Sequence, residues 1–319
     1  MGLKEIKFFY YLAGFLKAIT PKVFYTAALQ RWLNHPIQNI PEFQERLSYY
    51  ISADIHQHTG KQWLSIKEYK KPKKGSMYYI DMLSYIKYFP KHLKINYHFG
   101  DVNEDYGDAN ENFSSPTFVK SRPINHNGNA VLLKLNAYRH FKFINDTKHY
   151  QDKKDGIVWR GVIHKENRRE LVRKFHNHPL CNIGEVSPFE NKIEAWQKDY
   201  LTIQQQLDYK FILSVEGVDV ATNLKWIMSS NSLCFMPKPK YETWFMEGKL
   251  IPNHHYVLIE VDYSNLLEKR DYYSKNEAEA LAIIKNANQW VAQFQNKTLE
   301  KALGIHVLHQ FFTQTHQKL

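Results

Sequence analysis

The chain has 319 residues, of which 43% are hydrophobic and 15% aromatic, so it can form two domains that each bury a core. Lys and Arg outnumber Asp and Glu by 43 to 32, and the net charge of +11 favours anionic partners: nucleic acid, lipid head groups or phosphorylated substrates. Two cysteines, Cys181 and Cys234, are too few for a disulfide framework. We therefore expect a cytoplasmic protein.

The N-terminal segment holds an apolar, aromatic run at 8–16 flanked by Lys4, Lys7 and Lys17. This run is shorter than the roughly 20 residues that a membrane span requires. No small-residue cleavage site follows it, so a removed signal peptide is not expected. Two alternatives remain open: a helix lying in a membrane interface, or a helix packed on the protein's own core.

The next part of the chain is irregular, with a strand-like run at 93–99, a polar loop at 100–115 and apolar runs at 116–119 and 130–135. The carboxylates at the start of the loop are Asp101, Glu104, Asp105 and Asp108. Their spacing departs from an EF-hand, since the glycine and the last glutamate are misplaced. The chain also lacks an Asp-x-Asp pair, so we expect no metal site.

From about residue 150, strands and helices alternate. The expected strands are 156–159, 181–186, 209–215, 232–236 and 255–261, with helices at 167–175 and 221–230. This alternation predicts a mostly parallel sheet and a Rossmann-like domain, which binds its ligand beyond the carboxyl ends of the strands. No glycine fingerprint of a dehydrogenase or P-loop kinase is present. Ser274 and Glu277 predict a capping box before a helix at 278–291, and 299–312 predicts a last helix.

The first strand-to-helix junction with phosphate-binding character is Arg160-Gly161, followed by Arg168 in the helix. A guanidinium grips phosphate oxygens with two hydrogen bonds, and a glycine lets the backbone approach them. The alternative for Arg168 is a solvated helix face.

The second junction runs from Gly217 through Asn223 to Lys225. A cation in the first turn of a helix opposes the helix dipole, which argues against a purely structural reason for Lys225. Together the two junctions predict a cleft that binds a diphosphate.

Six segments, in order, resemble glycosyltransferase family 90, which includes bacterial lipopolysaccharide core transferases and protein O-glucosyltransferases. They are PTFVKSRP at 116–123, LNAYRHF at 135–141, VWRG at 158–161, DYKF at 208–211, the stretch 217–233 and PNHHYV at 252–257. The runs KSRP, NLKW and YETWFMEG make the bacterial lipopolysaccharide branch the nearest likeness.

The resemblance implies an α/β fold of the GT-B type, with two Rossmann-like domains facing a central cleft. We expect 1–124, completed by a helix at 286–319, to form the acceptor-side domain, and 125–285 to form the donor domain. The implied reaction is an inverting transfer of a hexose from UDP-glucose or UDP-galactose to a hydroxyl of the lipopolysaccharide core. No metal or other cofactor is implied.

The resemblance also implies roles for individual residues. Asp101 matches the catalytic base, and Lys120, Arg122 and Glu242 are candidates for the acceptor side or the cleft. The donor-binding candidates are Arg160, Gly161, Arg168, Gly217, Asn223 and Lys225. Eukaryotic members have Ser-Arg-Thr after the RG pair, whereas this chain has Val-Ile-His, and Asn223 stands where those members have an arginine. We therefore expect different donor contacts here.

Without the resemblance, the residues indicate a basic, Rossmann-containing protein with a phosphate-binding cleft. The second interpretation is a non-enzymatic module that binds nucleic acid or anionic lipid through its +11 charge. The basic run at 70–74 has no interleaved aromatic residues, so nucleic acid is not the expected partner. We expect a cytoplasmic enzyme, peripheral on the anionic inner face of the cell membrane.

Overall fold

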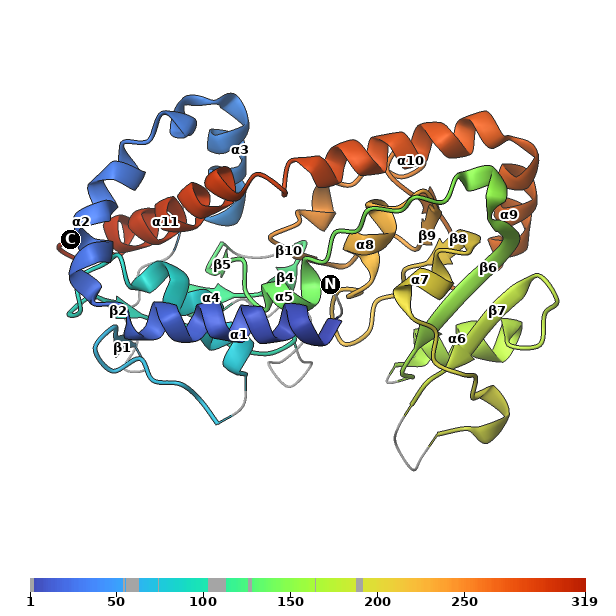
Figure 1. Ribbon diagram of the computed structural model, residues 1–319, viewed down its shortest axis with the longest axis horizontal. Helices are drawn as coiled ribbons and strands as arrows, with labels where there is room; N and C mark the ends of the chain where they lie inside the picture. Colours follow the sequence, from blue (N-terminus) through green and yellow to red (C-terminus); the bar gives the residue numbers. More distant parts are fainter. Residues whose placement is uncertain are drawn as a thin grey trace. The chain divides into compact units, whose positions relative to one another are not determined.

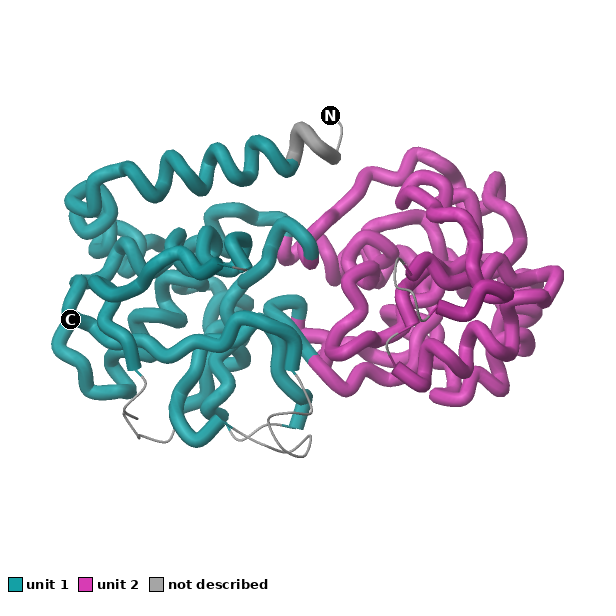
Figure 2. The backbone as a smooth tube through the Cα atoms, turned by 90° about the horizontal axis from the view of Figure 1, so that it is seen from below, with its two compact units in different colours: residues 1–139, 242–245, 295–319 teal, residues 140–241, 246–294 magenta. Residues whose placement is uncertain are grey.

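The computed structural model describes residues 3–53, 55, 63–73, 75–102, 113–125, 128–163, 165–187 and 192–319. These residues form two compact units (Figure 2). Unit 1 contains the chain up to Arg139, Glu242–Phe245 and Gln295–Leu319, and unit 2 contains His140–Tyr241 and Met246–Phe294. The boundaries differ from the expected ones at 125 and 286, because β5 pairs with β3 in unit 1 and α10 packs on β9 and α8 in unit 2.

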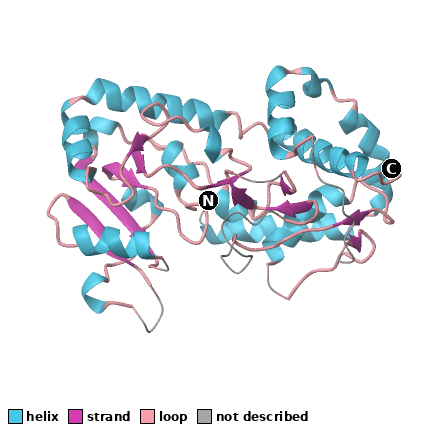
Figure 3. Ribbon diagram, turned by 180° about the vertical axis from the view of Figure 1, so that it is seen from behind, coloured by secondary structure: helices cyan, strands magenta, loops and turns pink. Residues whose placement is uncertain are grey.

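Unit 1 is mainly helical (Figures 1 and 3). Its helices are α1 (Leu3–Ile19), α2 (Lys22–Leu33), α3 (Pro41–Tyr50), α4 (Ser76–Ile86), the short α5 (Ala137–His140) at its edge and α11 (Lys297–Gln314). The C-terminal α11 packs against α2, α3 and α4, and its side chains are buried around most of its circumference. The apolar residues of α11, among them Leu303, Leu308 and Phe311, are buried against these helices, which holds the last helix of the chain in unit 1.

The described strands of unit 1 are short. They are β1 (Leu64–Ser65), β2 (Lys94–Ile95), β3 (Thr117–Val119), β4 (Ser121–Pro123), β5 (Ala130–Leu132) and β10 (Tyr241–Thr243). They pair as β1–β2, β3–β5 and β4–β10, and β3 and β5 run parallel. A further parallel bridge joins Tyr97 to Phe118. A Rossmann-like fold for the first domain stays a prediction.

Unit 2 is built on a five-stranded sheet in the order β11-β9-β8-β6-β7, with every neighbouring pair parallel. The strands are β6 (Lys154–Gly161), β7 (Cys181–Glu185), β8 (Tyr209–Leu213), β9 (Leu233–Met236) and β11 (Val257–Leu258). Each lies within or across a predicted run, so the parallel sheet is confirmed. Strands buried on both faces appear in the sequence as continuous apolar runs, and that pattern made them predictable.

The helices of unit 2 are α6 (Glu166–Phe175), α7 (Ile203–Gln206), α8 (Leu224–Met228), α9 (Leu266–Lys275) and α10 (Glu277–Ala292). On one face of the sheet, Ile157, Phe211 and Phe235 share a core with Leu171 of α6 and Ile283 of α10. Successive strand residues point to opposite faces, which is why alternate positions enter this core.

The predicted capping box at Ser274 is wrong. Ser274 lies inside α9 and donates to Asp155 Oδ1 at 2.6 Å. The helix that follows begins after Asn276, whose side chain makes no capping hydrogen bond to it.

Among the described residues, no helix is long and apolar enough to cross a membrane.

Candidate functional site

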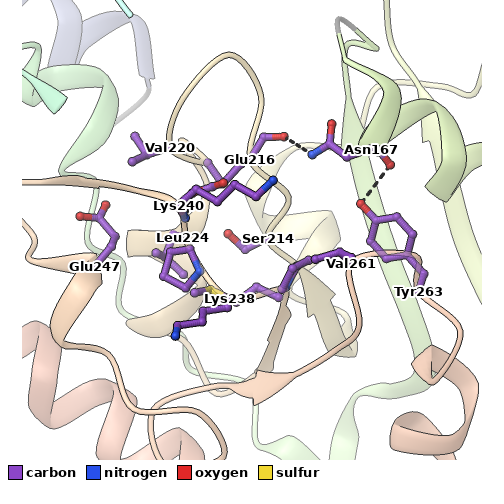
Figure 4. A pocket seen from close by; sticks show the side chains of 14 residues that line it. Asn167, Ser214, Glu216, Val220, Leu224, Lys238, Lys240, Glu247, Val261 and Tyr263 are labelled. Carbon is purple, nitrogen blue, oxygen red and sulfur yellow. Dashed lines mark hydrogen bonds between the residues drawn. The ribbon is translucent and has the colours of Figure 1, made fainter. Parts of the chain in front are cut away.

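A pocket lies in unit 2 beyond the carboxyl ends of β8 and β9 (Figure 4). It encloses about 630 Å³, counting the part open to solvent. Its wall comes from the segment after β8, the start of α8, the segment after β9, the first turn of α6 and the chain around Tyr263. In a parallel sheet this edge is where ligands bind, because the connecting loops diverge there. The pocket therefore has the position that the strand pattern predicts.

Glu216 is the carboxylate nearest the end of β8, and its Oε1 accepts hydrogen bonds from the backbone N–H groups of Lys240 (3.0 Å) and Tyr241 (3.3 Å). Burial, with a smaller contribution from the charge of Glu247, raises the pKa of Glu216 to about 7, and the two backbone donors limit this rise. The side chain thus changes its charge close to neutral pH. When protonated it can donate a hydrogen bond to a ligand; when ionised it repels an anion.

One wall of the pocket is fixed by hydrogen bonds between side chains and backbone (Figure 4). Tyr263 donates its hydroxyl hydrogen to the Asn167 carbonyl at 3.0 Å, and Asn167 donates from its amide to the Glu216 carbonyl at 3.0 Å. These bonds join the first turn of α6 to the end of β8. This wall offers neutral hydrogen-bonding groups to a ligand, and its hydrogen bonds hold it in place.

Positive charge at the pocket comes from Lys238 and Lys240, both exposed, in the Pro-Lys-Pro-Lys segment that follows β9. The sequence pattern predicts a strand at 232–236 but does not by itself single out these two lysines. Their position could have identified them: they directly follow the buried strand β9, and the neighbouring strand β8 also ends at the pocket. Lysine is a mobile point charge suited to phosphate oxygens.

Arg160 does not line the pocket. Its guanidinium donates to the carbonyl of Asp199 at 2.8 Å, and to the carbonyl and side-chain oxygens of Asn182 at 2.7 and 2.8 Å. These bonds tie the end of β6 to its neighbour β7. A glycine follows at 161 because a Cβ there would overlap the ring of Trp159. Diphosphate binding by Arg160 stays a prediction. Its guanidinium already bonds oxygen atoms of Asp199 and Asn182, and these contacts give the side chain a structural role.

Arg168 connects the strands that end at the site. It donates to the carbonyls of Val162, Val215 and Glu216 at 2.8–3.1 Å. The solvated-face interpretation of Arg168 is therefore wrong. A Cβ at Gly217 would lie 2.9 Å from Nη2 of Arg168, so the glycine permits the close approach of this guanidinium.

Asn223 and Lys225 lie behind the pocket wall. Asn223 donates to the Leu213 carbonyl at 2.9 Å, which ties the start of α8 to β8. Lys225 is fully buried and forms an ion pair with the equally buried Glu247, a residue of the pocket wall. This pair supplies the structural reason for Lys225 that the sequence analysis did not expect. A buried ammonium without such a partner would be costly.

In unit 1, Asp101 forms an ion pair with Lys120, which lies between β3 and β4. The Lys120 side chain is almost fully buried, whereas that of Asp101 is 36% exposed. The buried ammonium of Lys120 thus binds one carboxylate oxygen of Asp101, while the Asp101 side chain stays partly exposed to solvent. Burial lowers the pKa of His98, whose ring nitrogen lies 3.5 Å from the carbonyl oxygen of Asp101.

Arg122 and Glu242 pair with each other in the interior of unit 1 at 2.7 Å, each 2% exposed. Arg122 also donates to the carbonyls of Tyr49 (2.7 Å) and Ala130 (2.8 Å). Both side chains hold parts of unit 1 together. Contact of these two residues with an acceptor stays a prediction that this arrangement does not support.

Among the residues whose positions the structure gives, no group of three or more His, Cys, Asp or Glu side chains could hold a metal ion. The loop residues Glu104, Asp105 and Asp108 lie outside the described residues. Independence from metal stays a prediction.

The comparisons with known proteins decide the family. The model of glycosyl transferase family 90 matches residues 135–308, more than half of the chain. O-glucosyltransferase LpsA of Dichelobacter nodosus is 42% identical over 241 residues, which cover 75% of this chain and 73% of that protein. The chain belongs to glycosyltransferase family 90.

Two relatives of lower identity are also similar. Protein O-glucosyltransferase 3 of Homo sapiens and of Rattus norvegicus are each 30% identical over 139 residues, 42% of this chain and 27% of those proteins. The family match contains the whole of unit 2 and its pocket. Asp101 and Lys120 precede the matched residues. The protein is thus a glycosyltransferase, which requires a sugar donor and an acceptor.

Proposed function

We propose that this glycosyltransferase moves a hexose from UDP-glucose or UDP-galactose to a hydroxyl of the lipopolysaccharide core, with inversion at the anomeric carbon. Support for the transferred sugar comes from the 42% identity to a protein named as an O-glucosyltransferase. The acceptor and the UDP carrier rest on the family resemblance.

The observation that carries the proposal is the pocket at the carboxyl ends of β8 and β9, inside the residues that match the family. Lys238 and Lys240 bring two ammonium groups to its rim. A leaving diphosphate gains negative charge as the glycosidic bond breaks, and fixed cations stabilise that charge. The wall opposite Glu247 consists of Asn167 and Tyr263 and offers neutral hydrogen-bonding groups to the rest of the donor (Figure 4).

In the proposed reaction, Asp101 takes the proton of the acceptor hydroxyl while its oxygen attacks the anomeric carbon. The bond from that carbon to the UDP oxygen breaks, and UDP leaves with the electron pair. Attack from the face opposite UDP inverts the centre, so an α-linked donor gives a β-linked product. A positioned carboxylate contributes typically 10²–10⁴-fold to such a step.

The proposal includes a GT-B arrangement, with the donor bound by the second domain and the acceptor meeting the first. It also includes catalysis without a metal ion, the charge on the diphosphate being met by lysines. The proposal also includes a peripheral location on the cytoplasmic face of the membrane, which the net charge of +11 and the aromatic N-terminal helix support.

A thermal-shift panel of nucleotide sugars tests the proposal. UDP-glucose or UDP-galactose should raise the melting temperature, since a ligand at 100 times its dissociation constant stabilises by about 2.7 kcal/mol. GDP- and CMP-sugars serve as controls for non-specific anion binding. Product analysis on truncated lipopolysaccharide then reports the linkage. A panel in which no nucleotide sugar raises the melting temperature would contradict the proposal.

A further inference from the structure

Helix α1 carries its polar contacts on one side. Tyr10 donates to Asp81 Oδ1 of α4 at 2.7 Å, and the Tyr11 hydroxyl lies 3.0 Å from the hydroxyl of Ser76. Lys17 donates to Ser84 Oγ at 3.0 Å. Gly14, on the same side, lies so close to Ile80 that any side chain there would clash. These contacts fix the orientation of α1 on α4.

The opposite side of α1 is apolar and faces solvent. Half of the large hydrophobic side chains that are exposed in the described residues lie between positions 8 and 24. On α1 they are Phe8, Phe9, Leu12, Phe15, Leu16 and Ile19, and Val23 and Phe24 follow in the first turn of α2. We call these eight residues the apolar stripe. Phe8, Phe15 and Phe24 are 62%, 61% and 66% exposed.

The spacing of the stripe on α1 is that of one helical face, with positions 8, 12, 15 and 19 separated by four and three residues. A helix on the surface of a globular protein normally turns such a face inward. Here the inward face is occupied by α4, and in Figure 2 α1 runs along the outside of unit 1. A contiguous exposed apolar surface of this kind marks a site for a partner or a membrane.

Charge decides which partner fits. Between residues 3 and 35 the sequence holds five Lys and Arg residues and a single acidic residue, Glu5. The ammonium of Lys17 turns to Ser84 of α4 and that of Lys22 is buried, and the segment as a whole keeps a positive net charge. Two copies packed through this surface would bring like charges together, which is unfavourable. An anionic lipid surface meets both features, since basic residues attract its head groups and the apolar face enters the acyl boundary.

We propose that the apolar stripe docks this protein on an anionic lipid bilayer, with α1 lying flat in the interface and unit 1 held against the membrane. The flat orientation follows from the contacts of α1 with α4, which cover its other face along its length. This inference rests on the peripheral membrane location included in the proposed function and names the surface that makes the contact. That surface is separate from the pocket of unit 2, so vesicle binding can fail while UDP binding holds, and the reverse.

The first test places an environment-sensitive fluorophore on the stripe of the full chain. Cys181 and Cys234 are buried, so a Phe15→Cys variant accepts the label selectively. Vesicles of phosphatidylcholine with phosphatidylglycerol should shift the emission to shorter wavelength. The same label on Tyr200→Cys, an exposed position of unit 2, should not respond. An unchanged spectrum at position 15 would overturn the proposal.

The second test measures vesicle flotation of Phe8→Ser/Phe15→Ser/Phe24→Ser. Removing three exposed aromatic rings should weaken binding at least roughly tenfold. The control, Ile251→Ser/Tyr272→Ser/Leu281→Ser, removes three exposed side chains from unit 2 and should bind like the wild type. Equal binding by both variants would overturn the proposal. So would a wild-type dimer that the stripe variant dissociates, with no vesicle binding, because a second copy would then be the partner.

Discussion

At the scale of single residues, Asp101 and Lys120 form the best-defined catalytic candidate in unit 1. The ammonium of Lys120 is buried and the carboxylate it holds is partly exposed. This arrangement limits the rotamers of Asp101 while leaving it accessible to an acceptor hydroxyl. Precise placement is what makes a carboxylate an effective general base.

Asp101→Asn keeps the size of the side chain and removes its basicity. We expect UDP binding to stay intact and the turnover number to fall at least about a hundredfold. Steady-state kinetics together with UDP calorimetry measure the two effects separately. Near-normal turnover would move the role to a neighbouring carboxylate such as Glu104, Asp105 or Asp108, or disprove the mechanism.

Glu216 predicts a stability effect that depends on pH. Its pKa is raised from 4.5 to about 7, so the folded state holds this proton more tightly than the unfolded state. The stabilisation that results is complete below pH 4.5 and is lost as the pH rises through about 7. Glu216→Gln mimics the protonated form at every pH. It should therefore stabilise the protein at pH 8 by roughly 1–3 kcal/mol and have little effect at pH 4.

Denaturant unfolding of the wild type and of Glu216→Gln at pH 4 and pH 8 measures the difference in their free energies of unfolding. The control is Glu268→Gln, whose carboxylate lies in α9 with 76% exposure. That variant should show no difference between the two pH values. The same stability change at pH 4 and pH 8 in Glu216→Gln would contradict the assignment.

Single residues were the hardest to predict from the sequence. Arg160, Arg168 and Asn223 were correctly placed near strand ends, but the carbonyl oxygens that they bond come from distant parts of the chain. The same holds for the buried partners of Arg122 and Lys225. A strand-end cation can serve a phosphate or a neighbouring strand, and only tertiary contacts distinguish these roles.

At the scale of elements, periodicity was more informative. The strands of unit 2 were predicted because each is a short apolar run between helices, while the short strands of unit 1 carry little pattern. The capping box at Ser274 failed because helix α9 extends through it, and two helices meet there with one residue between them. A capping pattern in the sequence cannot show that one helix continues through it and a second begins directly afterwards.

Gly304 in the middle of α11 tests the packing of this helix on α4. A Cβ there would overlap the buried ring of Tyr85. Alanine is favoured over glycine in a helix by about 1 kcal/mol. The overlap costs typically 1–3 kcal/mol, so Gly304→Ala should lower the melting temperature. Adding Tyr85→Leu should recover part of the loss; an unchanged or raised melting temperature in the single variant would contradict the close packing.

At the scale of the whole molecule, the chain divides between two units and crosses between them more than once. The family resemblance led us to expect two domains and a C-terminal helix that completes the first, and α11 lies in unit 1. The exact boundaries depend on which strands pair, such as β5 with β3, and three-residue strands give no such signal.

Transferase activity should not depend on a divalent ion. The carboxylates of the acidic loop are not spaced as in an EF-hand, and the sequence contains no Asp-x-Asp pair. Release of UDP should continue in EDTA at an unchanged rate. The control is a metal-dependent transferase assayed in the same buffer. Activity that EDTA abolishes and manganese or magnesium restores would contradict this and would implicate Asp101 with Glu104, Asp105 and Asp108.

We propose that the pocket of unit 2 binds the diphosphate of a UDP-sugar. Calorimetry of UDP with the wild type and with Lys238→Met/Lys240→Met tests it most directly. The control, Lys275→Met/Lys285→Met, removes two exposed lysines of α9 and α10 and matches the change in charge. We expect UDP to bind the wild type and the control alike and the pocket variant at least roughly tenfold more weakly. No binding of UDP by the wild type, or equal affinity in all three proteins, would contradict the account.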